Sequence, residues 1–306
     1  MSLVTAKRGA ADSSQAPTGL GDLYPYASHR LEVDAGSYHY LDEGPKDGEV
    51  LLCVHGNPTW SFYWRRLVNA FRRTHRVVVP DHLGCGLSDK PQDWSYRLAD
   101  HVDNLERLVL ALDLKRITLA VHDWGGAIGM GLAARHPERI ARLVITNTAA
   151  FPDAHIPLRI QLCRTPLLGS FLVRRMNAFS GLLPVFGAQR KLAPDVRRGL
   201  LLPYDSYAHR VAVHRFVKDI PMHTGHASYA ELERIEASLA TFRNHPTCII
   251  WGERDWCFTP HFREEWERRF PDARVHRLPQ AGHLVLEDAP EDVEQAVRDF
   301  LKEPSA

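Results

Sequence analysis

Three residues that could perform covalent chemistry follow one another along the chain as an aspartate, a second aspartate and a histidine. Asp123 lies in "VHDWGG", Asp255 in "WGERDWCFTP" and His283 in "AGHLVLEDAPE". In a nucleophile elbow, a strand ends in a sharp turn before a helix, and an acid and a histidine follow later in this same order. The sequence therefore predicts Asp123 as nucleophile, Asp255 as orienting acid and His283 as base.

An aspartate at the tip of an elbow sets the kind of bond that the site can break. With an ordinary pKa of about 3.9, Asp123 is ionised at neutral pH and needs no base in order to attack. Attack on a saturated carbon that bears a leaving group gives an ester of the enzyme, whereas attack on a carbonyl would give an anhydride. His283 can then activate a water molecule that hydrolyses the ester, while Asp255 holds the imidazole.

The turn "HGNPTW" (55–60) offers hydrogen-bond donors opposite the elbow. The backbone N–H groups of Asn57 and Trp124 form a plausible oxyanion hole for the ester-hydrolysis step. The indole N–H of Trp124 and the side-chain amide of Asn57 can also hold a departing halide. The alternative is that this turn only reverses the chain.

Other side chains keep alternatives open. Tyr204 and Tyr207 could donate a proton to an epoxide or lactone oxygen, although aromatic residues in such a segment more often serve packing. Arg210 could meet a substrate carboxylate. Glu253 and Asp153 are the backup candidates for the orienting acid, and Asn147 cannot serve as one.

The elements that must position these residues alternate between apolar strands and amphipathic helices. This pattern is typical of β-α units in a mostly parallel sheet, which presents its site at the carboxyl ends of the strands. One helix is expected over 98–114 and another over 290–303. Seven strand segments are expected: "SYHYLDEG", "EVLLCVHG", "HRVVVPD", "RITLAVHD", "IARLVITN", "PTCIIWG" and "ARVHRLP".

The alternation stops for about a hundred residues between Thr148 and Thr247, where prolines separate short helical patterns. We interpret 150–228 as a helical cap inserted into a core made of 22–149 and 229–306. Residues 1–21 are rich in Ser, Gly, Ala and Pro, and are expected to form a flexible arm.

Composition narrows the function classes. The 306 residues carry 38 Lys and Arg against 37 Asp and Glu, so a net charge of +1 gives no support to nucleic-acid binding. The five cysteines are scattered without metal-ligand spacing, which favours reduced thiols of a cytoplasmic protein. No apolar run could span a membrane and no secretion signal is evident. The chemistry requires no metal and no organic cofactor, and the sequence leaves the oligomeric state undefined.

Taken together, "HGNPTWSFYWR", "PDHLGCGLSDKP", "HDWGGAIG", "WGERDWCFTP" and "AGHLVLEDAPE" resemble the haloalkane dehalogenases of the α/β-hydrolase superfamily. The resemblance covers nearly the whole chain after residue 22. It implies an eight-stranded, mostly parallel sheet with flanking helices and an inserted cap, and it implies Asn57 and Trp124 as the halide-stabilising pair. An acid after the late strand together with Asn57 resembles the third subfamily. That branch is also similar to the β-lactone decarboxylases of bacterial olefin biosynthesis.

Four functions follow as hypotheses. We favour hydrolysis of a small apolar haloalkane through an aspartyl ester, with release of alcohol, halide and a proton. The alternative is a cis-β-lactone decarboxylase that uses the same Asp123 and forms an olefin and CO₂; the cap stretch "PYDSYAHRVAVHRFVKDIP" resembles those enzymes. An epoxide hydrolase and a catalytically silent binding module are weaker hypotheses, since fold alone does not establish activity.

Overall fold

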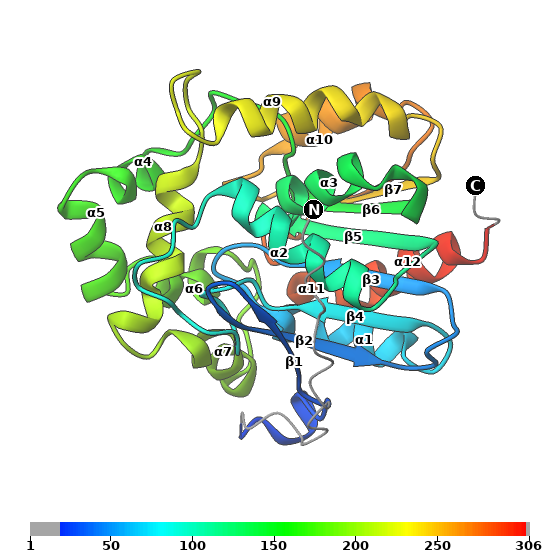
Figure 1. Cartoon of the computed structure of the whole chain (residues 1–306), viewed down its shortest axis with the longest axis horizontal. Helices are drawn as coiled ribbons and strands as arrows, with labels where there is room; N and C mark the ends of the chain where they lie inside the picture. Colours follow the sequence, from blue (N-terminus) through cyan, green and yellow to red (C-terminus); the bar gives the residue numbers. More distant parts are fainter. Residues whose placement is uncertain (1–18, 304–306) are drawn as a thin grey trace.

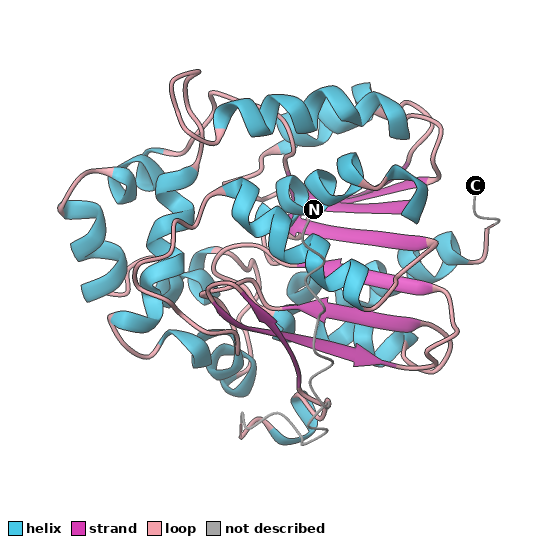
Figure 2. Ribbon diagram, in the orientation of Figure 1, coloured by secondary structure: helices cyan, strands magenta, loops and turns pink. Residues whose placement is uncertain are grey.

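The computed structural model describes residues 19–303. Most of the predicted flexible arm therefore lies outside the described residues. Eight strands form one sheet in the order β1-β2-β4-β3-β5-β6-β7-β8, with helices on both faces (Figures 1 and 2). The α/β-hydrolase fold expected from the resemblance is confirmed.

Each of the seven expected strand segments contains one strand, and the eighth strand was not expected from the residues. The strands are β1 (His29–Val33), β2 (Gly36–Glu43), β3 (Val50–Val54), β4 (Arg76–Pro80), β5 (Ile117–Asp123), β6 (Ile140–Thr148), β7 (Thr247–Gly252) and β8 (Arg274–Leu278). β1 pairs antiparallel with β2, and β2 pairs antiparallel with β4. The other neighbours are parallel, so the carboxyl ends of β3 to β8 meet at one edge.

Helices cover both faces of the sheet because its central strands are apolar on both sides. Every residue of β5 is buried. One core joins the sheet to α2 (Leu98–Ala111), α3 (Trp124–Arg135), α9 (Tyr229–Ser238) and α10 (Pro260–Arg269). The opposite core joins it to α1 (Arg65–Phe71), α11 (Val285–Asp288) and α12 (Pro290–Leu301).

The segment between β6 and α9 forms a group of short helices beside the sheet, on the left of Figure 1. They are α4 (Leu158–Arg164), α5 (Leu168–Ser170), the π-helix η4 (Phe171–Arg175), α6 (Leu183–Phe186), α7 (Pro194–Leu201) and α8 (Val211–Asp219). Prolines begin or interrupt several of them, which keeps the helices short. We call residues 150–228 the cap segment; its separation from the core as a domain stays a prediction.

Short 3₁₀ turns connect the remaining parts: η1 (Gly21–Leu23), η2 (Ser61–Trp64), η3 (Pro137–Arg139), η5 (Ser180–Leu182), η6 (Leu202–Tyr204), η7 (Ala208–Arg210) and η8 (Leu239–Phe242). Among residues 19–303, no helix combines the length and the apolar character that crossing a membrane requires. All five cysteines are free, and four of them are buried.

Candidate active site

β5 and α3 place Asp123 at a sharp turn. Asp123 is the last residue of β5, Trp124 is the first of α3, and the backbone of Asp123 has φ 50° and ψ −126°. This conformation is rare for a residue with a side chain, and it is kept only where the surrounding structure enforces it. Gly125 is required here because a side chain would collide with the carbonyl of Val54. The strained turn points the Asp123 carboxylate away from the sheet.

The Asp123 carboxylate lies between backbone donors and a histidine. Its Oδ1 accepts a hydrogen bond of 2.6 Å from the backbone N–H of Asn57, and the N–H of Trp124 also donates to the carboxylate. Its Oδ2 lies 3.9 Å from Nε2 of His283. A side chain at residue 56 would overlap the carboxylate, so the turn needs Gly56. The structure thus brings the two predicted oxyanion-hole donors and the predicted base to the predicted nucleophile.

The third predicted partner, Asp255, holds the other side of the imidazole. Nδ1 of His283 donates to Oδ2 of Asp255 over 2.9 Å, which leaves Nε2 facing Asp123. Oδ1 of Asp255 accepts the N–H of Cys257 at 2.7 Å. The carbonyl of His283 accepts a hydrogen bond of 2.9 Å from Nε2 of His122. The order Asp123, His283, Asp255 in space is the geometry of a catalytic triad.

Asn147 is a further residue of this site that the sequence did not reveal. It is the next-to-last residue of β6 and has a positive φ of 33°, and its Nδ2 donates to Oδ2 of Asp255 at 3.0 Å. Its amide also bonds both backbone groups of Gly252. Asn147 cannot serve as the acid, but it holds the carboxylate of Asp255, the predicted orienting acid. The only signal in the sequence was its place at a strand end.

Burial and charge shift the titration of the nucleophile and the base. Burial raises the pKa of Asp123, and the opposing effects of His283 and of the N–H groups of Asn57 and Trp124 offset this only in part. Burial alone would lower the pKa of His283, but the charges of Asp255 and Asp123 and the hydrogen bond to Asp255 outweigh it, so the pKa is raised. The two carboxylates therefore favour the protonated form of His283 more than water would.

Asp123 lies in the wall of a cavity of about 500 Å³ between the sheet edge and the cap segment. Asn57, Trp124 and His283 surround the same part of the wall. Apolar side chains from the core and from the cap line much of the remainder, among them Phe151, Ile160, Phe179, Leu183, Phe258 and Phe262. Such a cavity suits an apolar substrate whose reactive group meets a few polar atoms.

Asn57 and Trp124, the predicted halide-binding pair, both line this cavity. Nδ2 of Asn57 donates to the carbonyl of Val213 in α8 over 3.2 Å. Oδ1 of Asn57 is buried and has no hydrogen-bond partner among residues 19–303. One hydrogen of the amide is therefore engaged by the cap segment, and the donor pair is only partly free for an anion.

Tyr204, Tyr207 and Arg210 are used inside the cap segment, and none of the three is among the residues that line the cavity. Tyr204 is buried and donates to the carbonyl of Thr59 at 3.3 Å. The Tyr207 ring is exposed and stacks under Arg174. Arg210 donates to the carbonyls of Tyr204 and Arg174. These contacts are structural.

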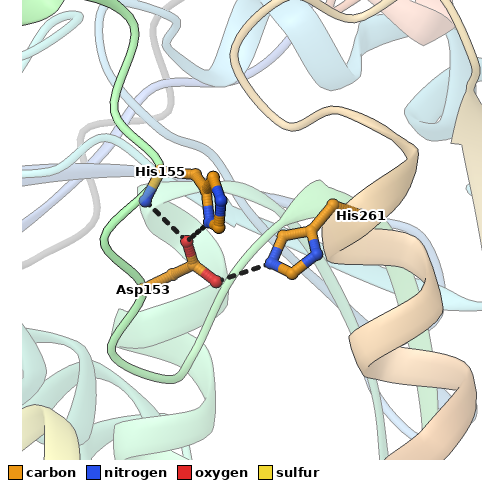
Figure 3. A group of neighbouring side chains, drawn as sticks. All are labelled: Asp153, His155 and His261. Atoms are coloured by element: carbon orange, nitrogen blue, oxygen red, sulfur yellow. Dashed lines mark hydrogen bonds and ion pairs between the residues drawn. The ribbon is translucent and has the colours of Figure 1, made fainter.

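Asp153, one backup acid, belongs to a separate cluster shown in Figure 3. Its Oδ1 bonds Nδ1 of His155 and its Oδ2 bonds Nε2 of His261, each over 2.7 Å. Burial would raise the pKa of Asp153, but the hydrogen bonds from His261 and His155 outweigh it and lower the pKa. The cluster joins the start of the cap segment to α10. The other backup acid, Glu253, pairs with Arg263.

Comparison with known proteins identifies the family of this chain. Residues 49–290 match the family model described as the alpha/beta hydrolase fold. The chain therefore belongs to the α/β-hydrolase family. Within that family it resembles a haloalkane dehalogenase of Bradyrhizobium elkani in structure, with a TM-score of 0.83 at 26% identity over 90% of this chain and 97% of the other.

Sequence relatives carry two kinds of name. A cis-3-alkyl-4-alkyloxetan-2-one decarboxylase of Shewanella oneidensis is 46% identical, over 93% of this chain and 91% of its own. A protein of the same name from Xanthomonas campestris is 43% identical, over 91% and 97%. Haloalkane dehalogenase 2 of Mycobacterium tuberculosis is 32% identical, over 90% and 95%. The chain is thus an enzyme of this family. Some of its relatives are named decarboxylases and others haloalkane dehalogenases.

Proposed function

We propose that this enzyme decarboxylates cis-β-lactones that carry two alkyl chains, with Asp123 as nucleophile. The observation that carries the proposal is the identity of 46% and 43% to two decarboxylases of such oxetan-2-ones, against 32% to a dehalogenase. Haloalkane hydrolysis, which the sequence alone favoured, ranks second. The side chain of Asn57 also favours decarboxylation over haloalkane hydrolysis. A halide needs the Asn57 amide as a donor, and this amide already donates to the carbonyl of Val213.

In the first step, a carboxylate oxygen of Asp123 attacks the saturated ring carbon that bears the ring oxygen. The bond between this carbon and the ring oxygen breaks, and the electron pair stays on the substrate as a carboxylate. Opening the four-membered ring releases its strain. The product of the step is an alkyl ester of Asp123 whose neighbouring carbon carries the new carboxylate.

In the second step, the bond from that neighbouring carbon to the carboxylate breaks and CO₂ leaves. Its electron pair forms the carbon–carbon double bond, and the ester bond to Asp123 breaks so that the nucleophile recovers its negative charge. No water is consumed and no proton is gained or lost. The reaction yields one alkene and one CO₂ for each lactone.

The site supports this second step in two ways. The N–H groups of Asn57 and Trp124 stabilise the Asp123 carboxylate as it leaves. The apolar cavity keeps water from the carboxylate of the ester intermediate. Without water this charged group is less stable, which favours its loss as neutral CO₂. When His283 is protonated, its positive charge 3.9 Å from Asp123 stabilises the departing carboxylate.

Haloalkane hydrolysis is the second candidate, supported by Trp124 and Asn57 in the cavity wall and by Nε2 of His283, which is free to activate water. An epoxide hydrolase is less well supported, because Tyr204 and Tyr207 are committed elsewhere. A silent binding module would leave the strain at Asp123 and the buried triad unexplained.

The test gives purified enzyme a cis-3,4-dialkyl-β-lactone and measures alkene by gas chromatography together with CO₂. Equal amounts of the two products, lost in Asp123→Asn, would support the proposal. In parallel, 1-bromohexane is supplied and bromide is measured. Bromide release without alkene from the lactone would overturn the proposal in favour of the dehalogenase. No product from either substrate with folded enzyme would favour the remaining hypotheses.

A further inference from the structure

The outer side of the cap segment exposes many large apolar side chains. Within residues 19–303, all exposed large apolar side chains except Leu110 and Tyr207 fall between residues 158 and 186. We call this region the outer cap surface and represent it by Leu158, Leu162, Leu167, Leu168, Phe171 and Met176. Exposed apolar side chains concentrated in one segment point to a candidate interaction surface.

Leu167 shows that this exposure is not a by-product of packing. It is 89% exposed and has a positive φ of 60°. Glycine or asparagine adopts that conformation more readily than leucine does. Because the Leu167 side chain gains little from the protein interior, a leucine at this turn is best explained by something outside the protein.

The charge of the same region is one-sided. Residues 154–194 contain six basic residues and no Asp or Glu: Arg159, Arg164, Arg174, Arg175, Arg190 and Lys191. None of the six takes part in an ion pair within the part of the chain that the structure describes. Arg175 and Lys191 are exposed. The segment that carries the outer cap surface is thus basic, although the whole chain has a net charge of only +1.

The outer cap surface is also the roof of the cavity. Ile160 and Cys163 line the cavity, while Leu158 and Leu162 of the same helix face outward. Phe186 does both, since it lines the cavity and is 49% exposed. In Figure 1, α4 and α5 lie at the left end of the molecule, away from α12. A single layer of short helices therefore separates the apolar cavity from the outside.

We propose that the outer cap surface docks this enzyme on the face of an anionic lipid bilayer. Exposed Leu, Phe and Met side chains enter the region between headgroups and acyl chains, and the unpaired cations meet lipid phosphates. A protein partner or a second copy would offer an apolar surface too. A segment with basic residues and no acidic residue, however, matches the phosphates of an anionic bilayer. Docking places the cavity roof against the phase in which an apolar substrate dissolves. The proposal does not depend on which reaction Asp123 performs.

The experiment is co-sedimentation of the purified full chain with vesicles of phosphatidylcholine, with or without phosphatidylglycerol, in the absence of substrate. We expect binding to the anionic vesicles that weakens as salt is added. Leu167→Asp should lower the partition coefficient roughly tenfold or more, because it replaces an inserted apolar side chain with a charge. Arg175→Glu with Lys191→Glu should lower binding to anionic vesicles and leave the thermal midpoint unchanged.

Leu110→Asp is the matched control, since Leu110 is a 45% exposed leucine on α2, away from the cap segment. It should bind vesicles as the wild type does. Equal loss in Leu110→Asp and Leu167→Asp, or no binding of the wild type to anionic vesicles, overturns the proposal. A concentration-dependent dimer that Leu167→Asp dissociates, without vesicle binding, assigns the surface to a second copy and equally overturns it. Because no substrate is present, failure here leaves the proposed reaction untouched.

Discussion

The floor of the cavity and the outer cap surface use opposite physical means. On the floor, polar groups are buried and bonded: Asp123 to the N–H of Asn57, His283 to Asp255, and Asp255 to Asn147. On the outer cap surface, apolar groups are exposed, and nearby cations lack ion-pair partners within the described residues. A buried polar network fixes geometry to fractions of an ångström. An exposed apolar surface instead determines what the molecule associates with, without positioning individual atoms.

The largest effect is expected from Asp123→Asn. The amide cannot supply the electron pair that forms the ester, so alkene and bromide formation should both fall by about ten-thousand-fold or more. The measurement is product formation per active protein, with the thermal midpoint as a check of folding. Retained alkene formation would show that the lactone is opened without Asp123.

His283→Gln should separate the two candidate reactions. Ester hydrolysis needs a base, so the variant should bind one alkyl group from 1-bromohexane and then stop, with the added mass visible by mass spectrometry. Decarboxylation needs no base, so alkene formation should fall only roughly a hundredfold through the lost charge. Complete loss of alkene together with a trapped lactone adduct would mean that the second step does require His283.

Asn147→Ala should have a smaller effect that is still specific to the site. Asp255 loses a buried hydrogen bond, so we expect the free energy of unfolding to fall by about 2 kcal/mol. Because Asp255 raises the pKa of His283, a misplaced Asp255 should let His283 lose its proton at lower pH and move the basic limb of alkene formation to lower pH. An unchanged pH profile with lowered stability would make Asn147 structural and not a positioning residue.

The smallest effect is expected at the cluster in Figure 3. The folded state lowers the pKa of Asp153, so its interactions stabilise above the ordinary carboxyl pKa of about 3.9 and are lost as pH falls through the folded value. Since its two partners are exposed, His155 at 73% and His261 at 40%, Asp153→Asn should cost no more than about 1 kcal/mol near pH 6 and less near pH 3. Urea unfolding at the two pH values makes the measurement, and equal losses at both would contradict the assignment to the charge.

The sequence predicted the central strands well because buried parallel strands are apolar runs bounded by turns, as in "RITLAVHD". It missed β1, whose five residues are mostly half-exposed at the sheet edge and give no such run. The five predicted site residues lie together since each follows a strand whose carboxyl end meets the others. Their chemical roles stay predictions.

What could not be read from the sequence depends on contacts between distant segments. Asn147 donates a hydrogen bond to Asp255, which is 108 residues later in the sequence. No motif around Asn147 predicts this contact. The segment "LRIQLCRTPLLGSFLV" has the same apolar pattern whether its leucines are buried or exposed. Only the packing of α4, α5 and η4 shows which of them face outward. The substrate depends on the shape of the cavity, which short helices of the cap segment line. Local helix propensity does not determine how these helices are placed relative to one another.

The loop from Asn57 to Trp60 is bonded to the cap segment at three points. Asn57 donates to Val213, Trp60 donates to Gly199, and Tyr204 donates to Thr59. This loop also supplies the N–H that holds Asp123. One of the two predicted oxyanion-hole donors, the N–H of Asn57, therefore lies in a loop that is held by the cap segment. A displacement of the cap segment would thus also act on the donor that holds the nucleophile.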